Sequence, residues 1–449
     1  MANLIRIGKG LDIKLKGKAI ETLSQVGHSD LCALTVSDFH GLTPKVIARP
    51  GDKVKAGSVL LCDKNRQEVK FVSPVSGTVV AVNRGDKRKV LDVLVKADSA
   101  NEFESFAKID LSKASGEEVK TLLLNAGMWP FIKQRPYDLI ANPQEAPKAI
   151  FISTFDTAPL AADFEFVLKG QEADFQTALN ALAHIAPVHL GVHENAQSSA
   201  LKNASNVTIH TFAGKHPTGN VGVQIHHVSP INKGEIVWVV NPQDLIIMGR
   251  LFNKGVTDFS RIVALTGSEV VKTGYVKIQA GSLITPLFKS NVTKGKALRY
   301  ISGNVLTGTQ VTPESYLNFY ANQLTVIPEG TEKHEMFGWI MPRLNQFSIN
   351  HSYFSWLLPK KEYVLDARIK GGQRALIMSN ELDKVFPFDI FPEILLKAII
   401  TNNIDQMEAL GIYEVAPEDF ALCEFVDTSK TEIQKIVREG LDMLFKEMN

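Results

Sequence analysis

The 449-residue sequence contains very few cysteines, and their spacing excludes several kinds of redox site. Only Cys32, Cys62 and Cys423 are present, and no two of them form a C-x-x-C pair. Such a sparse and odd set is typical of reduced thiols in a cytoplasmic protein, not of a disulfide framework. An iron–sulfur cluster is normally held by four thiolates, so we expect the chain to bind none by itself.

Long hydrophobic segments are also absent. The N-terminal residues Met1–Arg6 have no apolar core and no small-residue cleavage site, so they do not predict a signal peptide. A membrane helix needs roughly 18–20 continuous apolar residues, whereas the most apolar stretches here, such as Ile236–Val240, have the length of a strand. If the protein works at a membrane, we expect it to dock to one without crossing it.

The sequence has almost no net charge, with 49 Lys and Arg against 48 Asp and Glu. Nucleic-acid binders usually show a basic excess, so we expect no nucleic-acid partner. The ends differ, however: residues 1–100 carry 17 cations and 10 anions, a net +7, and residues 381–449 carry 6 and 15, a net −9. These are either solvated surfaces, or a basic face toward an acidic partner or an anionic membrane and an acidic face elsewhere.

Several motifs that carry chemistry are missing. No G-x-G-x-x-G follows a predicted strand, and there is no P-loop, no G-x-S-x-G elbow and no H-E-x-x-H. The histidines at 210, 216, 226 and 227 are clustered, but neighbouring residues of a strand point to opposite faces. No Cys or carboxylate at ligand spacing completes a set, so we predict no metal site.

The patterns that are present predict an α/β protein of several domains. Residues 1–100 alternate short apolar runs with Gly/Pro turns, which indicates strands. Residues 101–260 begin with a helix after Gly116 and continue with strands at 149–153, 188–192 and 207–212 and a helix near 170–184. This alternation predicts a parallel sheet with crossover helices.

The remaining residues form three further segments. Residues 261–330 return to strands, at 263–267, at 274–278 and, bounded by glycines, at 303–309. Residues 331–390 are a connecting region of strands and loops. Residues 391–449 are helical and end in the amphipathic segment 432–448.

Two of these segments resemble known modules. Pro50-Gly51-Asp52-x-Val54-x-x-Gly57-x-x-Leu60, followed by Ser73-Pro74-x-x-Gly77-x-Val79, resembles a biotinyl/lipoyl-like barrel-sandwich domain. Lys64 is the candidate for the lysine that lipoyl carriers modify, but it lies farther from Pro74 than the carrier pattern has it, so we favour a structural barrel-sandwich. The glycines of 263–279 and 302–309 resemble a β-grasp domain of the soluble-ligand-binding (SLBB) type, with a plain β-meander as the alternative.

The order of these modules resembles that of the C subunit of Rnf-type complexes and of the flavin subunit of complex I. The modules are a barrel-sandwich, a Rossmann-like α/β domain, a β-grasp domain and C-terminal helices. Their order is most similar to the A-subunit family of the Na⁺-translocating NADH:quinone reductases. The segments that carry this resemblance are Ile7–Ile13, Val82–Arg88, Ala149–Ala162, Ile301–Thr309, Phe337–Pro342 and Ala421–Val426. The resemblance implies a peripheral subunit on the cytoplasmic face of the bacterial inner membrane. Its partners would be the B to F subunits, chiefly the membrane-embedded B subunit, in a translocase that couples ubiquinone reduction to Na⁺ export, and the isolated chain would be inactive.

The resemblance also implies that redox centres have been lost. The flavin-binding relatives cradle phosphate on a glycine-rich loop, but the corresponding segment 125–133 keeps one glycine and adds the bulky Trp129. Of the relatives' C-terminal cysteine runs only Cys423 remains, with Asp427 nearby, so residues 391–449 resemble a degenerate ferredoxin-like domain. We expect no tightly bound cofactor in this chain and expect FMN, FAD and Fe–S centres in partner subunits. The alternative is an active NADH- and flavin-binding subunit of an Rnf-type complex.

A role at the quinone end requires an apolar slot with a few polar groups. Trp129 and Phe131 offer ring surface, and Lys133 and Arg135 offer donors, so these four are candidates for binding or docking ubiquinone. The alternative is that the rings are core residues and the cations are solvated. His216 is a further candidate, for proton handling near quinol, unless it only shapes its loop.

Four cations, Arg84, Lys87, Arg88 and Lys89, fall on one predicted hairpin turn. They are either an ordinary solvated turn or a docking site for partner subunits. A purely structural linker that binds no ligand is the remaining interpretation of the whole chain.

Overall fold

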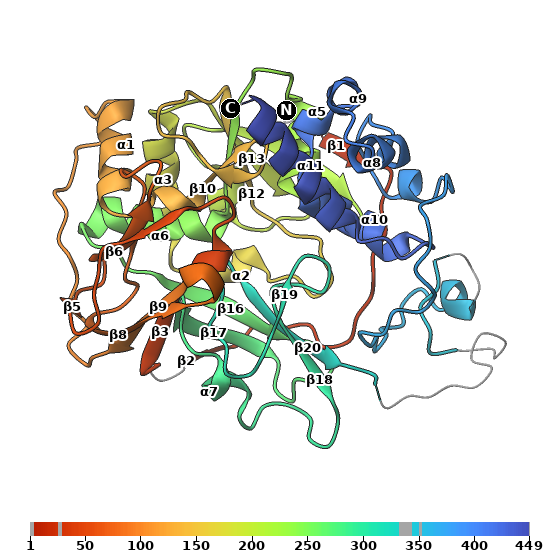
Figure 1. The fold of residues 1–449 in the computed structure, drawn as a ribbon, viewed down its shortest axis with the longest axis horizontal. Coiled ribbons are helices and arrows are strands. Elements are labelled where there is room, and N and C mark those ends of the chain that lie inside the picture. Colours follow the sequence, from red (N-terminus) through yellow and green to blue (C-terminus); the bar gives the residue numbers. More distant parts are fainter. Residues whose placement is uncertain (1–3, 26–28, 332–343, 350–352, 449) are drawn as a thin grey trace.

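The computed structural model describes residues 4–25, 29–331, 344–349 and 353–448 (Figure 1). Within these residues the chain forms four sheets, and helices cover the largest of them. The segment Phe337–Pro342, which contributed to the resemblance, lies outside the described residues.

A seven-stranded sheet forms the centre of the molecule, and its parallel core confirms the expected α/β region. Its strand order is β1 (Leu4–Ile7), β14 (Thr208–Gly214), β13 (Val188–His193), β12 (Ala149–Ser153), β15 (Val237–Val240), β10 (Ile132–Arg135) and β11 (Leu139–Ile140). The first five strands run parallel, and β10 and β11 close one edge in antiparallel pairs. Although β1 lies within residues 1–100, it therefore belongs to this sheet.

Helices pack on both faces of this sheet because its strands alternate their apolar side chains. Ile150 and Ile152 join the core cluster of α3 (Glu172–Ala183) and α6 (Pro242–Lys254). Phe151, on the opposite face, packs with Ile225 of α5 (Val221–Val228). Two short helices, α2 (Phe164–Leu168) and α4 (Ser199–Lys202), lie in the connections. The strand period of two thus buries both faces, as in a doubly wound sheet.

Local signals in the sequence fix the helix ends. Helix α1 (Gly116–Asn125) begins with a capping box, in which the Ser115 hydroxyl accepts from the Glu118 N–H and the Glu118 carboxylate accepts from the Ser115 N–H. Helix α6 begins with Asn241 as its cap and Pro242 in its first turn, and it ends at the left-handed Gly255. Both starts place a polar side chain directly before the first helical residue.

Two small sheets form the barrel-sandwich region. One contains β3 (Leu31–Thr35), β9 (Val90–Ala97), β8 (Gly77–Arg84) and β5 (Lys53–Val54), and the other contains β4 (Pro44–Val46), β6 (Val59–Asp63) and β7 (Lys70–Val72). Side chains of both sheets, such as Leu61 and Val93, share one buried cluster. Lys64 follows β6 and is exposed.

A mixed six-stranded sheet contains the predicted strands near 263–267 and 274–278. Its order is β19 (Thr309–Val311), β18 (Leu298–Ser302), β20 (Gln323–Pro328), β16 (Ser260–Thr266), β17 (Gly274–Gln279) and β2 (Leu23–Gln25), and the short helix α7 (Thr285–Phe288) follows β17. The predicted strand at 303–309 is wrong: residues 303–308 form the turn between β18 and β19. The Asn304 side chain accepts from the N–H groups of Leu306 and Thr307, which competes with strand pairing.

The C-terminal residues form the predicted helical region (Figure 1). Its helices are α8 (Pro392–Ile400), α9 (Ile404–Ala409), α10 (Ala421–Val426) and α11 (Ile433–Met448). Their apolar faces share a second core cluster that includes Cys423, whose thiol is fully buried. The boundaries proposed between the five regions stay predictions.

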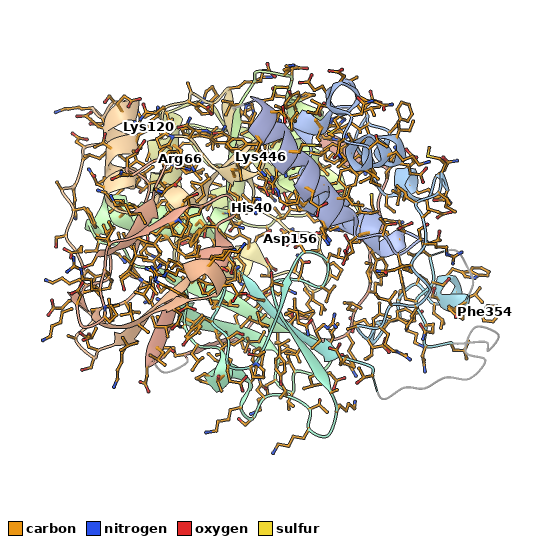
Figure 2. The ribbon with its side chains drawn as sticks, in the orientation of Figure 1. His40, Arg66, Lys120, Asp156, Phe354 and Lys446 are labelled. Atoms are coloured by element: carbon orange, nitrogen blue, oxygen red, sulfur yellow. The ribbon has the colours of Figure 1, made fainter. Side chains whose placement is uncertain are left out.

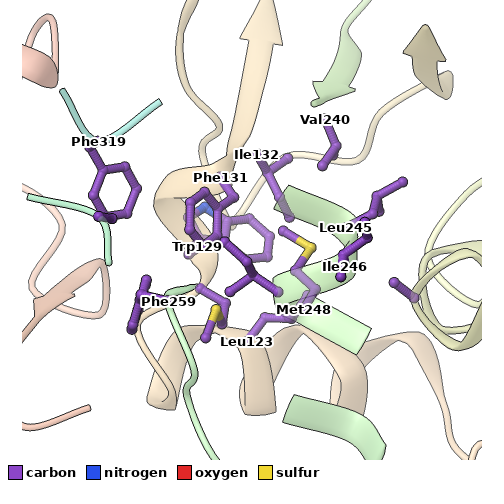
Figure 3. Close-up of a cluster of buried hydrophobic side chains, with 14 of the residues drawn as sticks. Leu123, Trp129, Phe131, Ile132, Val240, Leu245, Ile246, Met248, Phe259 and Phe319 are labelled. Carbon is purple, nitrogen blue, oxygen red and sulfur yellow. The ribbon is translucent and has the colours of Figure 1, made fainter. Parts of the chain in front are cut away.

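An aromatic cluster joins the barrel-sandwich, the central sheet and the six-stranded sheet (Figure 3). Trp129 is fully buried, its Nε1–H donates to the Ala141 carbonyl at 2.8 Å, and its ring meets Trp238 edge-on with centroids 5.2 Å apart. Phe131 stacks on Phe319 with centroids 4.8 Å apart. These rings are core residues that hold three regions together.

We expect Trp129→Ala to destabilise the protein by about 3–5 kcal/mol, because it removes a buried ring and leaves a cavity. Trp129→Phe should cost less, since a ring still packs against Trp238 and mainly the hydrogen bond to Ala141 is lost. Urea unfolding followed by circular dichroism measures both. The matched control is Trp356→Ala at a side chain exposed by 52%; equal losses at 129 and 356 would contradict the assignment of Trp129 to the core.

Candidate functional site

A cavity of about 570 Å³ lies where the regions of the protein meet. Its walls include Asp38 from the barrel-sandwich, the ends of β12 and β15 from the central sheet, the turn 303–308, and Glu418 from the helical region. The chain leaves β12 for β13 on one side, whereas β15 lies on the other, so the strand order reverses there. Ligands of doubly wound proteins bind at this reversal, at the carboxyl ends of the strands.

The central sheet contributes loops that approach each other closely. After β12 come Asp156 and Thr157, and after β14 come His216 and Gly219. A Cβ atom at Gly219 would lie 2.6 Å from the Thr157 nitrogen, so only glycine fits there. Figure 2 shows Asp156 near the middle of the molecule, where these loops meet. The glycine therefore shapes this wall of the cavity.

Two helices begin at the cavity. Asn220 precedes α5, and Asn241 precedes α6, and both side chains line the cavity. The start of each helix carries the positive end of the helix dipole, although in α6 Pro242 has no N–H and the N–H groups of Gln243 and Asp244 already donate to Asn241. These helix starts favour a ligand atom that bears or develops negative charge, whereas the carboxyl groups of the same lining, such as Asp156 and Glu418, oppose it.

Lys133 supplies a cation with an accessible side chain. It projects from β10 with its side chain 40% exposed, and its Nζ lies 4.9 Å from the ring centre of Tyr320. Its Nζ lies 4.0 Å from the Asp138 Oδ1, at the limit of an ion pair. The Tyr320 hydroxyl donates to the Pro130 carbonyl at 2.7 Å, which fixes the ring. The Lys133 ammonium can thus donate to a ligand.

Arg135 lies in the same wall but is already paired. Its side chain is 2% exposed, and its guanidinium contacts Asp419 at 2.6 Å and Glu418 at 2.7 Å. Burial by itself would lower the pKa of Arg135, but the two carboxylates outweigh this and raise it. Glu418 lines the cavity with its side chain 44% exposed, and desolvation raises the pKa of its carboxyl, which Arg135 opposes. Arg135 therefore joins the central sheet to the helical region.

The barrel-sandwich and the β-grasp sheet meet the cavity at Asp38. Its carboxylate accepts from the Asn318 side chain at 2.7 Å and from the Phe319 N–H at 2.8 Å. Burial raises the pKa of Asp38 to about 7, and these two hydrogen bonds oppose the shift. Phe131, stacked on Phe319, forms the apolar side of the same wall.

His216 lies in the cavity wall as a neutral imidazole. Its Nδ1 lies 3.1 Å from the Thr157 hydroxyl, which accepts from the Gly219 N–H at 2.9 Å. The hydrogen bond between the Thr157 hydroxyl and Nδ1 fixes the orientation of the ring. Burial lowers the pKa of His216 from 6.5 to about 4.

The five sequence candidates thus separate by position. Phe131, Lys133, Arg135 and His216 line the cavity, whereas Trp129 lies in the core beneath it. Their roles in binding stay predictions. The structure adds polar residues that the sequence analysis missed, namely Asp38, Asn220, Asn241 and Glu418. The asparagines had a signal, because each follows a strand and precedes a helix, whereas Asp38 and Glu418 reach the cavity only through tertiary contacts.

The remaining candidates lie elsewhere. The four cations at the turn between β8 and β9 are exposed and are not part of the cavity lining: Arg84, Lys87, Arg88 and Lys89. Their role in docking stays a prediction. His210 pairs with His189 at 2.8 Å, and His226 pairs with Glu414 at 2.7 Å. Among the described residues, no group of three or more His, Cys, Asp or Glu side chains is placed to hold a metal ion.

Family models match three stretches of the chain. Residues 5–98 match the "NqrA N-terminal barrel-sandwich hybrid domain", residues 114–257 the "NqrA second alpha/beta domain", and residues 262–313 the "NQRA C-terminal domain" of the SLBB model. With the helical C-terminal region, these matches confirm the fold class expected from the sequence.

Curated relatives match along the full length. The A subunit of the Na(+)-translocating NADH-quinone reductase from Haemophilus influenzae strain Rd is 36% identical over 453 residues, and that from Neisseria meningitidis strain Z2491 is 35% identical over 452. The same subunit from Vibrio atlanticus is 35% identical over 448. In each case the match covers 99% of this chain and the whole of the relative.

The lowered pKa of His216 predicts a defined pH dependence of stability. In the unfolded chain the imidazole takes up its proton near pH 6.5, but in the folded protein only near pH 4. The stabilisation is therefore complete above pH 6.5 and is lost as the pH falls toward 4, by up to about 3 kcal/mol. We expect the difference in unfolding free energy between wild type and His216→Asn to shrink over this range. The raised pKa of Asp38 makes its contribution to stability fall as the pH rises, but this contribution is the same in both proteins and cancels in the difference between their unfolding free energies. A difference that does not change with pH would refute the lowered pKa of His216.

Proposed function

Because the chain belongs to the A-subunit family of the Na⁺-translocating NADH-quinone reductases, we propose that it is a peripheral subunit of this translocase without a cofactor of its own, and that its central cavity takes the quinone head group. The observation that carries the proposal is the cavity itself, with Phe131, Lys133 and two helix N-termini in its walls. The isolated chain would be inactive, because the reaction needs electrons from NADH.

The size of the cavity and the rings in part of its lining suit a quinone. Its volume of about 570 Å³ falls within the range of small-molecule sites, roughly 300–1,000 Å³. Phe131, Phe155, Phe164 and Tyr320 supply ring surface, and Lys133 supplies a donor for a carbonyl oxygen. The rest of the lining is largely polar, so the rings would hold the flat quinone on one side while polar side chains orient its carbonyls.

The electrostatics also suit reduction of a quinone to a quinol. The ring gains two electrons and two protons, and negative charge develops on its oxygens before the protons arrive. The Lys133 ammonium and the starts of α5 and α6 would stabilise that charge. In this proposal the electrons come from NADH through redox groups of partner subunits, which would hold FMN, FAD and Fe–S centres.

The segment that corresponds to the relatives' phosphate loop supports a subunit without flavin. The N–H groups of Gly127, Met128 and Phe131 donate to the carbonyls of Leu124, Leu123 and Met128. A phosphate cradle needs such groups to be free and to point at the ligand. Trp129 fills the space beside them. We therefore prefer this function to that of an active flavin-binding subunit of the Rnf type.

The proposed place is the cytoplasmic face of the inner membrane, with the membrane-embedded B subunit as the chief partner among the B to F subunits. No helix in the described part of the chain is long and apolar enough to cross a membrane. The exposed cations at 84 and 87–89 remain our candidates for contact with the partner subunits.

Lys133→Gln should weaken binding of a short-chain ubiquinone by about tenfold, because it removes a charged donor worth roughly 1.4 kcal/mol. Isothermal titration calorimetry on the full chain measures this. Lys148→Gln is the matched control, since Lys148 directly precedes β12 of the same sheet, has a side chain exposed by 36%, and pairs with Glu235 outside the cavity. An unchanged affinity of the Lys133→Gln variant for the quinone, or no saturable binding of the quinone by the wild type, would contradict the proposed quinone site.

The purified chain should show no absorbance of flavin or of an iron–sulfur cluster between about 350 and 500 nm, because its phosphate-loop segment donates its N–H groups internally. An absorption spectrum before and after acid precipitation decides this. A yellow supernatant with flavin fluorescence would favour the flavin-binding alternative.

A further inference from the structure

A group of large apolar side chains is exposed on the segment before the C-terminal helices. Phe354, Trp356, Leu357 and Leu358 are exposed by 46%, 52%, 56% and 43%, and they occupy one short 3₁₀ turn and the residue after it. Figure 2 shows Phe354 at the outer edge of the molecule, far from Asp156 in the central cavity. Side chains of this size usually become buried, and four within one turn are unusual for a free surface.

Neighbouring contacts extend this surface. The Lys361 ammonium donates to the Leu344 carbonyl at 2.9 Å, which brings the exposed Leu344 beside the turn. Val364, exposed by 46%, follows Tyr363, which bridges to Leu15 in the N-terminal segment. We call these six exposed residues the apolar patch: Leu344, Phe354, Trp356, Leu357, Leu358 and Val364.

Lysines surround the apolar patch. Lys14 donates to the Pro359 carbonyl, and Lys16 follows on the same segment, where the Lys16 N–H donates to the Tyr363 carbonyl at 3.0 Å. Lys360 and Lys361 come shortly after the turn. Glu362 is the one acidic residue in 344–364, so apolar side chains are combined here with a clear excess of positive charge.

This combination indicates which surface would cover the patch. Trp, Phe and Leu next to Lys are typical of segments that lie in the interface of a bilayer, where the rings enter the headgroup region and the ammonium groups meet lipid phosphates. Cytoplasmic loops of membrane proteins themselves carry an excess of Lys and Arg, so they match a basic rim poorly. A second copy of the chain would bring the same positive charges together.

We infer that the apolar patch docks the protein on an anionic lipid surface, with the turn 354–358 in the headgroup region and the surrounding lysines, chiefly the exposed Lys16 and Lys360, on lipid phosphates. This inference rests on the peripheral role proposed above but not on the quinone site. A failure of lipid binding would therefore leave the ubiquinone titration unaffected, and the reverse also holds.

The test is flotation of the full-length chain with vesicles of phosphatidylcholine, with and without about 30% phosphatidylglycerol, a content that gives a clearly negative surface. The wild type should bind the anionic vesicles and lose most binding in about 0.5 M NaCl. Trp356→Ser with Leu357→Ser should weaken binding about tenfold or more, and Lys16→Glu with Lys360→Glu should remove the preference for phosphatidylglycerol.

The matched control is Phe391→Ser with Ile400→Ser, at side chains of α8 and its cap region that are exposed by 65% and 53% outside the patch, and it should bind like the wild type. Circular dichroism establishes that each variant is folded. No binding by the wild type, or equal binding by the Trp356/Leu357 variant, overturns the inference. Self-association in solution that this variant abolishes, without vesicle binding, would assign the patch to a second copy.

Discussion

The arrangement of the protein depends on the contact between the Arg135 guanidinium and the carboxylates of Glu418 and Asp419. Arg135 lies at the end of β10, near one edge of the central sheet, whereas its partners are more than 280 residues later in the chain. Taking these charges out of water is costly, and the contact compensates only if its geometry is good. Gly222 makes this possible, because a Cβ atom there would lie 2.4 Å from both the Arg135 Nη1 and the Asp419 Oδ1. One glycine and one arginine thus join the helical region to the central sheet, together with the apolar contacts of Ile7 and Val223.

The resulting position of the helical region creates the cavity. With the helical region held against the carboxyl ends of the strands, Glu418 lines one side, while the turn 303–308 and Asp38 line the others. Asp38 and His216 are themselves buried against these walls, so desolvation raises the pKa of Asp38 and lowers that of His216. Within such walls the Lys133 ammonium and the helix N-termini act on a ligand more strongly than they would in water. The same ion cluster that orders the domains therefore also makes the site electrostatically selective.

Much of the fold could be predicted from the sequence because its signals are local. Strands at 149–153 and 188–193 follow from short apolar runs, and α6 follows from Asn241, Pro242 and Gly255. The same reasoning wrongly predicted a strand at 303–309, because the glycines of residues 303–308 belong to a turn that Asn304 stabilises. At the site, Phe131 and Lys133 could be found, since alternate residues of one segment offer a ring and a cation. Glu418 and Asp38 could not, because nothing local distinguishes them from solvated acids.

Trp129 shows how one buried residue can decide between two chemistries. A phosphate cradle needs glycines, free N–H groups and space for the ligand. In this chain Gly127 keeps a left-handed conformation, but a Cβ atom there would lie 2.4 Å from Val72, so this glycine serves packing against the barrel-sandwich. The indole fills the adjacent space and bonds to Ala141, on the segment that follows β11. Replacing open backbone by a packed ring stabilises the junction of three regions and positions Phe131 and Lys133 at the cavity. The residue that opposes a flavin site thereby builds the wall of the site that we assign to quinone.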